Sequence, residues 1–196
     1  MSIASSEKKP LRRPALTMVL LAWLVLVALE YFWIPLFRVA ELFAWFAIMV
    51  AWLWMIGWST VAALTYLSFR AYGRCDAVLL LALGAGTVAR TTHWETLYAE
   101  GQVWLHRDAF AELAADHGNG RPLTVPGWMR YLSIDGQVRP QRDVLYLPVF
   151  EDWRAESGRG IAYIPGSDGR GTTVHTASGD LGSATYDLGG GWWWVE

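Results

Sequence analysis

The chain has 196 residues, of which 54% are hydrophobic, 17% charged and 14% aromatic, and it contains 13 tryptophans. Soluble domains carry about 25% charged residues, so this chain is poor in charge. This composition argues against a nucleic-acid-binding protein and against a disordered chain. Residues 1–92 carry a net charge of +4, whereas residues 93–196 carry −6. The two halves therefore differ in character.

Two apolar segments in the first half are long enough to cross a membrane. Residues 15–37 contain one charged side chain, Glu30, and residues 42–69 contain none. A helix needs about 20 apolar residues to cross about 30 Å of hydrocarbon. We therefore expect membrane-spanning helices at about 15–37 and 42–69. A signal peptide is the alternative for the first segment, but no small-residue cleavage site follows its apolar run.

A third apolar segment is shorter. Residues 77–89 are uncharged, and their flanks extend the segment to 75–94, where Arg90 can snorkel to the headgroups and Trp94 suits the interface. If 75–94 spans, the chain has three spans, a cytoplasmic N-terminus and an extracytoplasmic C-terminal half. If it does not span, the C-terminal half is cytoplasmic.

The positions of the basic residues favour three spans. With a cytoplasmic N-terminus, most of them flank the spans on the cytoplasmic side, as the positive-inside rule requires. These cytoplasmic residues are Lys8, Lys9, Arg12, Arg13, Arg70 and Arg74. We therefore predict a multi-pass protein of the cell membrane with residues 1–92 as its anchor and the lipid bilayer as its first partner.

The predicted spans contain two kinds of candidate residue. Glu30 is a candidate polar site within the membrane, because a carboxylate in lipid is costly and often functional. It also lies near the outer end of its helix, where it can reach interfacial water. Residues 42–69 contain four tryptophans, which could fill the helix bundle or contact a membrane-protein partner: Trp45, Trp52, Trp54 and Trp58. By helical periodicity the first two share one face and the last two share roughly the opposite face.

The second half predicts a small α+β domain with an antiparallel sheet over residues 95–196. Residues 95–117 have an apolar stripe typical of a helix. Short apolar runs separated by Gly, Ser and Asp then indicate strands. The runs are Trp128–Ile134, Val144–Phe150, Ile161–Ile164, Thr172–His175, Ala184–Leu188 and Trp192–Val195. A helix followed by several short strands is typical of an α+β domain.

Three stretches of this half resemble a known group of proteins. Leu97–Phe110, Arg159–Asp168 and Tyr186–Val195 are similar to segments of uncharacterised actinobacterial membrane-anchored proteins. Those proteins have N-terminal apolar spans, a Gly-x-Ala-Tyr-x-Pro strand and a terminal Leu-Gly-Gly-x-Trp strand. The resemblance covers about residues 94–196. It implies an exported domain, and it brings no activity and no catalytic residue.

The sequence offers no strong catalytic or metal-binding motif. The four histidines are scattered without metal-ligand spacing: His93, His106, His117 and His175. We therefore predict no metal site and no cofactor. Asp108, Glu151 and Asp152 are the carboxylates that an enzyme acting on envelope material would use. Asp108 is also explained as a helix-start residue, and the adjacent acidic pair as a solvated loop.

The terminal strand contains three consecutive tryptophans. Alternation would turn Trp193 to one face and Trp192 and Trp194 to the other. One set could close the core and the other could contact a partner or ligand, so Trp192 and Trp194 are candidate contact residues. We favour a non-enzymatic membrane protein with an exported binding or scaffold domain. The alternatives are a small accessory subunit of a larger membrane complex and the carboxylate-dependent enzyme.

Overall fold

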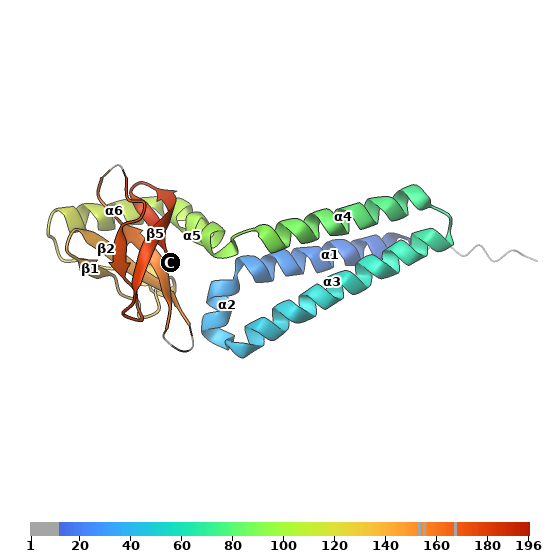
Figure 1. Ribbon diagram of the computed structural model, residues 1–196, viewed down its shortest axis with the longest axis horizontal. Coiled ribbons are helices and arrows are strands. Elements are labelled where there is room, and N and C mark those ends of the chain that lie inside the picture. The colour runs from blue at the N-terminus through green and yellow to red at the C-terminus, as the bar shows by residue number, and fades with distance from the viewer. Residues whose placement is uncertain (1–11, 153, 155, 167) are drawn as a thin grey trace, which may run out of the picture. The chain divides into compact units, whose positions relative to one another are not determined.

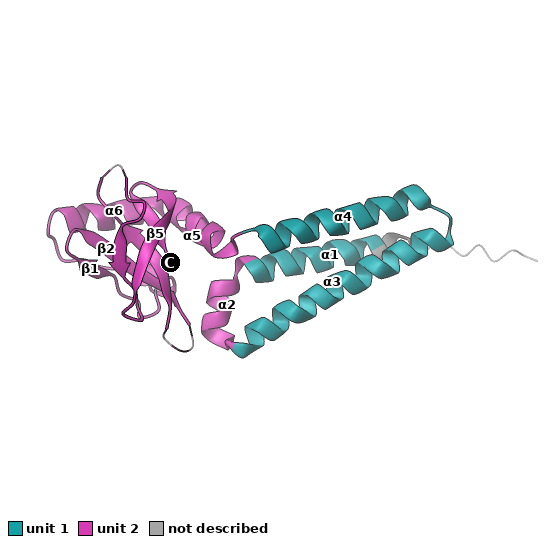
Figure 2. Ribbon diagram, in the orientation of Figure 1, with its two compact units in different colours: residues 1–30, 42–92 teal, residues 31–41, 93–196 magenta. Residues whose placement is uncertain are grey.

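The computed structural model describes residues 12–152, 154, 156–166 and 168–196. They divide into two compact units, as Figure 2 shows: residues up to Glu30 with 42–92, and residues 31–41 with 93–196. The chain thus leaves the first unit, contributes a short segment to the second, and returns. The predicted basic segment that includes Lys8 and Lys9 lies outside the described residues.

The first unit is a bundle of three helices, labelled in Figure 1: α1 (Arg12–Tyr31), α3 (Leu42–Ser68) and α4 (Tyr72–Thr91). By length and hydropathy, α3 and α4 can each cross a membrane. α1 passes the same test only together with the next helix, α2, as a pair bent by 74°. The shortest segment predicted from the sequence, 75–94, therefore corresponds to one of the two helices that pass alone.

Small side chains line the inward face of α3. Its buried residues recur every three or four positions, as one face of a helix requires: Ala44, Ile48, Ala51, Met55, Ser59, Ala62, Ala63 and Tyr66. Small residues let neighbouring helices approach closely where no hydrophobic effect drives them together. The opposite face exposes large apolar side chains such as Leu53 and Leu64, which suit contact with lipid.

The predicted single helix over 15–37 is wrong at its C-terminal end. The first helix ends at Tyr31, and α2 (Trp33–Ala40) begins after Phe32. Pro35 accounts for the break, because its ring would clash with the carbonyl of Tyr31 if one helix continued through both. In the first turn of a new helix, the missing N–H of a proline costs nothing. α2 then packs into the second unit and not into the bundle.

The second unit continues with two helices instead of the predicted one. α5 (Trp94–Leu105) and α6 (Arg107–Gly118) are separated at His106. The predicted strand Trp128–Ile134 is also wrong, because residues Gly127–Tyr131 form a short 3₁₀ helix, η1. Met129 and Leu132, three positions apart, are the buried apolar residues of this run. That spacing belongs to a helical turn, whereas a strand buries alternate residues.

Six antiparallel strands form one sheet in the order β1-β2-β3-β6-β5-β4. Five of them match predicted runs within a few residues, and β1 was not predicted. Their bounds are β1 (Arg139–Gln141), β2 (Val144–Glu151), β3 (Gly158–Tyr163), β4 (Thr173–His175), β5 (Leu181–Gly189) and β6 (Trp192–Val195). The sequence prediction of an N-terminal helical part followed by a small antiparallel domain is confirmed at this level.

The sheet curls until its two edge strands are joined, so that it is nearly a barrel. The Nε2 of Gln141 on β1 donates to the carbonyl of His175 on β4, at 2.6 Å. The backbone N–H of His175 donates back to the Oε1 of Gln141, at 2.9 Å. The side chain of Gln141 thus pairs two backbone groups of β4, which an edge strand otherwise leaves exposed.

Apolar side chains cover both faces of the curled sheet. One core lies against the helices and includes Phe110, Leu147 and Trp194. The other lies against the opposite face and includes Tyr146 and Trp193. A domain of about 100 residues can thereby bury a core without disulfides, and Cys75, the single cysteine, is a free thiol in α4 of the other unit.

Candidate functional site

Two of the candidate residues in the predicted spans lie in contact. The indole Nε1 of Trp52 on α3 donates to Oε1 of Glu30 at the end of α1, at 3.1 Å. The carboxylate therefore has a hydrogen-bond partner inside the bundle, which lowers the cost of burying it partly among apolar helices. The sequence marked both residues but did not pair them, because helical periodicity within one helix says nothing about its neighbour.

The other tryptophans of α3 differ in exposure. Trp45 and Trp54 are exposed, and Trp58 is half-buried. Exposed indole rings on an apolar helix suit lipid and the interface. The indole of Trp52 has a polar partner on another helix, the carboxylate of Glu30.

The terminal tryptophans lie in the two cores. Trp192 and Trp194 are 2% and 1% exposed and belong to the core against the helices. Trp193 is also buried, in the core on the opposite face of the sheet. The predicted alternation is present, but both faces of β6 are covered. The side chains of Trp192 and Trp194 therefore lie almost entirely within the core, the first of the two roles considered for such residues.

Arg38 of α2 binds a cluster of backbone carbonyls in the same unit. Its Nη2 donates to the carbonyls of Leu132 at 3.1 Å and Val149 at 2.7 Å. Its Nη1 donates to the carbonyl of Ser133 at 3.2 Å and also to that of Tyr131. A guanidinium holds several donors in one plane and can satisfy such a cluster, which a lysine cannot.

Apolar contacts hold α2 beside this cluster. Ile34 is 2% exposed in the core of the second unit, and the rings of Phe37 and Phe150 are 5.3 Å apart. Tyr31, the last residue of α1, packs edge-on to Tyr98 of α5, and their ring centroids are 5.7 Å apart. Burial raises the pKa of Tyr98 to about 12, so its phenol stays neutral in this core. α2 is thus an integral part of the second unit.

The carboxylates that an enzyme would use have local roles where the structure gives them partners. The side chain of Asp108 is fully exposed, and its Oδ1 lies 3.6 Å from the Nε of Arg107. The Oδ1 of Asp152 accepts the backbone N–H of Glu156 at 2.8 Å, and this bond is the main reason that the pKa of Asp152 lies below its ordinary value. Glu151 ends β2, paired with Gly158. Within the described residues, no group of three or more His, Cys, Asp or Glu could hold a metal ion.

A narrow pocket of about 260 Å³ opens on the second unit between α5, α6 and the β5–β6 turn. Its floor includes Phe110 and Trp192, whose rings meet edge-to-face at 4.8 Å. Trp104 stands at its rim with 73% of its surface exposed. Glu100 and Arg107 add one charge of each sign to the lining. The site therefore combines an apolar floor, an exposed aromatic ring and two opposite charges.

Sequence reasoning missed this site and the Arg38 cluster. Trp104 lies within the apolar stripe that predicts a helix over 95–117, and the break at His106 has no proline or glycine to mark it. Arg38 reads as an ordinary charged residue between two spans. The proline at position 35 was the available signal that the segment after Tyr31 leaves the first helix.

Comparison of the chain with protein-family models, with curated proteins and with solved structures finds no match.

Proposed function

We propose that this chain is a three-pass membrane protein that carries a non-enzymatic binding module on the extracytoplasmic side of the cell membrane. The module consists of α2 and residues 93–196, and α1, α3 and α4 are the spans. The lengths and hydropathy of α3 and α4 support the anchor. The excess of basic residues expected on the cytoplasmic flanks supports the orientation.

The docking of α2 carries the proposal that α4 spans together with α3. α2 precedes α3, whereas the rest of its unit follows α4, and Arg38 and Ile34 tie the two parts together. Two parts of one folded unit must lie on the same side of a membrane. The chain between them must then cross the membrane an even number of times. α3 and α4 meet this condition if both span, whereas a chain in which α1 and α3 span and α4 does not would separate α2 from its unit.

The pocket beside Trp104 is the binding face that the module offers. Small-molecule sites usually enclose about 300–1,000 Å³, and this pocket is slightly smaller, at about 260 Å³. It suits one large apolar side chain of a protein partner, with Trp104 covering the neighbouring surface. Exposed aromatic rings beside a small apolar pocket are typical of the centre of protein interfaces. We infer that the occupant is a segment of another envelope protein.

Site-specific photocrosslinking in the native host tests this binding face. A photoreactive phenylalanine analogue replaces Trp104 in one variant and Leu181, an apolar residue on β5 that is 63% exposed, in the control. The proposal predicts one discrete protein adduct at position 104 that is absent at position 181. Adducts of the same mass at both positions, or none at 104, would contradict it. If the adduct contains an integral membrane protein, this chain is an accessory subunit of a complex.

A further inference from the structure

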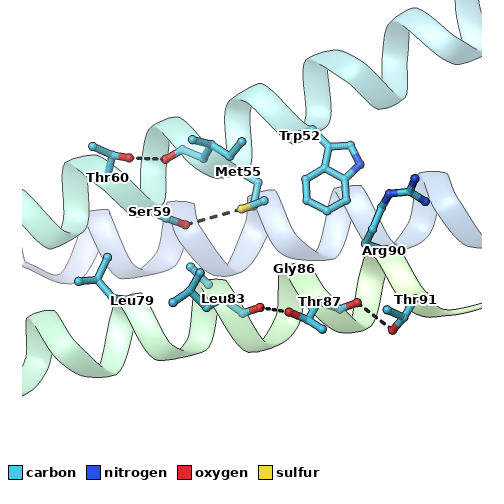
Figure 3. A pocket seen from close by; sticks show the side chains of 12 residues that line it. Trp52, Met55, Ser59, Thr60, Leu79, Leu83, Gly86, Thr87, Arg90 and Thr91 are labelled. Carbon is cyan, nitrogen blue, oxygen red and sulfur yellow. Dashed lines mark hydrogen bonds between the residues drawn. The ribbon is translucent and has the colours of Figure 1, made fainter.

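A groove of about 600 Å³ lies in the helical unit between α3 and α4 (Figure 3). Most of its wall is apolar and includes Met55, Ile56, Leu79 and Leu83. In a bundle that spans a membrane, such a groove faces hydrocarbon, where water gains no hydrogen bonds. An apolar chain is therefore the occupant that its walls favour.

The hydroxyl groups of the groove do not change this chemistry. The Oγ1 of Thr60 donates to the carbonyl of Ile56 and that of Thr87 to the carbonyl of Leu83, both at 2.8 Å. Thr91 likewise donates to the carbonyl of Thr87, at 2.9 Å. Each donor is satisfied by its own helix, as threonines in apolar helices commonly are. The hydroxyls therefore leave the groove apolar along its length.

One end of the groove is charged. Arg90, in the last turn of α4, is the one ionisable residue among those that line the groove. It is exposed, and the structure gives it no ion pair or hydrogen bond among the described residues. Figure 3 shows its side chain beside the indole ring of Trp52. Trp52 is itself held by Glu30, so the wall next to the guanidinium is fixed in place.

The sequence of α4 explains why the groove is open. Ala82, Gly86 and Arg90 are spaced by four residues and therefore share one face of the helix. The first two leave space that larger residues would fill. A Cβ on Gly86 would touch Trp23 of α1 at 3.6 Å, an ordinary contact, so packing against α1 does not demand a glycine there. Small residues followed by an arginine give this face an apolar trough with a cationic end.

We propose that this groove binds one phospholipid, with an acyl chain between α3 and α4 and the phosphate on Arg90. The inference rests on the proposed membrane insertion. A guanidinium binds phosphate oxygens with two parallel hydrogen bonds, and basic residues between membrane helices are known to hold lipid headgroups. The phosphate is common to anionic and zwitterionic phospholipids. Glu30, which accepts a hydrogen bond from Trp52, is the acidic group next to this wall of the groove.

Native mass spectrometry of the full chain in mild detergent tests the headgroup contact. The probes are palmitoyl-oleoyl phosphatidylglycerol, palmitoyl-oleoyl phosphatidylethanolamine and the phosphate-free palmitoyl-oleoyl glycerol. Arg90→Gln is compared with Arg74→Gln, an exposed arginine in the first turn of the same helix and outside the groove lining. We expect one retained phospholipid, weakened at least about tenfold by Arg90→Gln and unchanged by Arg74→Gln. Equal effects of the two substitutions would overturn the headgroup contact.

A second pair of variants tests the acyl chain. Ala82→Trp fills the groove, whereas Leu80→Trp places the same side chain on a residue of α4 outside the lining. We expect loss of the bound phospholipid in the first variant and retention in the second, with both variants monodisperse and equally helical by circular dichroism. Retention in Ala82→Trp, or tighter binding of the phosphate-free lipid than of the phospholipids, would overturn the proposal. The proposed binding face is tested separately, by crosslinking at Trp104 in the other unit. Failure of that test is therefore distinguishable from failure of lipid binding.

Discussion

Arg38 is the residue that joins α2 most directly to the rest of the second unit. It supplies donors to four backbone carbonyls from a helix that is more than 90 residues distant in sequence. Replacement by alanine leaves those carbonyls without this donor, and each buried acceptor left unpaired costs about 1–3 kcal/mol. We expect Arg38→Ala to lower the free energy of unfolding of this unit by about 3 kcal/mol or more.

Pulse proteolysis in detergent measures this loss. Arg38→Lys keeps the charge but cannot fork between the carbonyls, so it should recover only part of the stability. Arg121→Ala is the control, because Arg121 is exposed and its ion pair with Asp116 spans 3.6 Å. Exposed pairs contribute about 0–1 kcal/mol. Equal losses in Arg38→Ala and Arg121→Ala would refute a special role for the carbonyl cluster.

Gly160 is required by close packing across the sheet. A Cβ at this position would lie 2.4 Å from the carbonyl oxygen of Leu147 and 2.6 Å from the ring of Tyr146. Both neighbours are fully buried. We expect Gly160→Ala to destabilise the unit by about 1–3 kcal/mol, the usual cost of overpacking. Gly118→Ala, where a Cβ meets nothing within 4 Å, should change stability by less than about 1 kcal/mol. Urea titration of both variants gives the comparison.

α2 is the element whose role differs most from its appearance in the sequence. Residues 33–37 read as the end of the first predicted span, yet they belong to a helix that packs in the second unit. Ile34→Ala should cost about 2–5 kcal/mol, because it removes a fully buried side chain from the core. Val39, 87% exposed on the same helix, provides the control. If Val39→Ala and Ile34→Ala unfold at the same denaturant concentration, α2 is not part of this core.

The contact between β1 and β4 makes a second prediction about elements. Gln141 donates to and accepts from the backbone of His175. Gln141→Leu keeps most of the side-chain volume but removes both hydrogen bonds, so β4 loses its link to the other edge. We expect the amide of His175 to exchange with solvent faster in this variant, measured by hydrogen exchange. The amides of β3, in the middle of the sheet, should exchange as before. An unchanged rate at His175 would show that the edges need no such link.

Elements with strong local patterns could be predicted from the sequence. The uncharged run of 42–69 leaves few alternatives to a long apolar helix, and β2, β3 and β6 follow short apolar runs between turn residues. η1 was mistaken for a strand because an alternating run can also contain residues three apart on one helical face. The contacts between Glu30 and Trp52 and between Arg38 and its carbonyls are tertiary. No local pattern specifies them.

At the scale of the whole molecule, the two regions of the chain carry net charges of opposite sign. Residues 1–92 carry +4 and residues 93–196 carry −6. The segment 31–41 nevertheless lies within the first region by sequence, although it packs in the second structural unit. The domain boundary predicted at residue 92 therefore omits a piece of the second unit. A fragment that begins at residue 93 lacks Ile34 and Arg38, and we expect it to be less stable than the same unit in the full chain.

The central claim is that α2 and residues 93–196 lie on the same, extracytoplasmic side of the membrane. Cys75 is buried and is replaced by alanine, after which single cysteines are introduced at Val39, at Asn119 after α6, or at Arg70 between α3 and α4. All three positions are exposed. A membrane-impermeant maleimide applied to spheroplasts should label positions 39 and 119, and label position 70 only after lysis. Labelling of 39 and 119 from opposite sides would contradict the account.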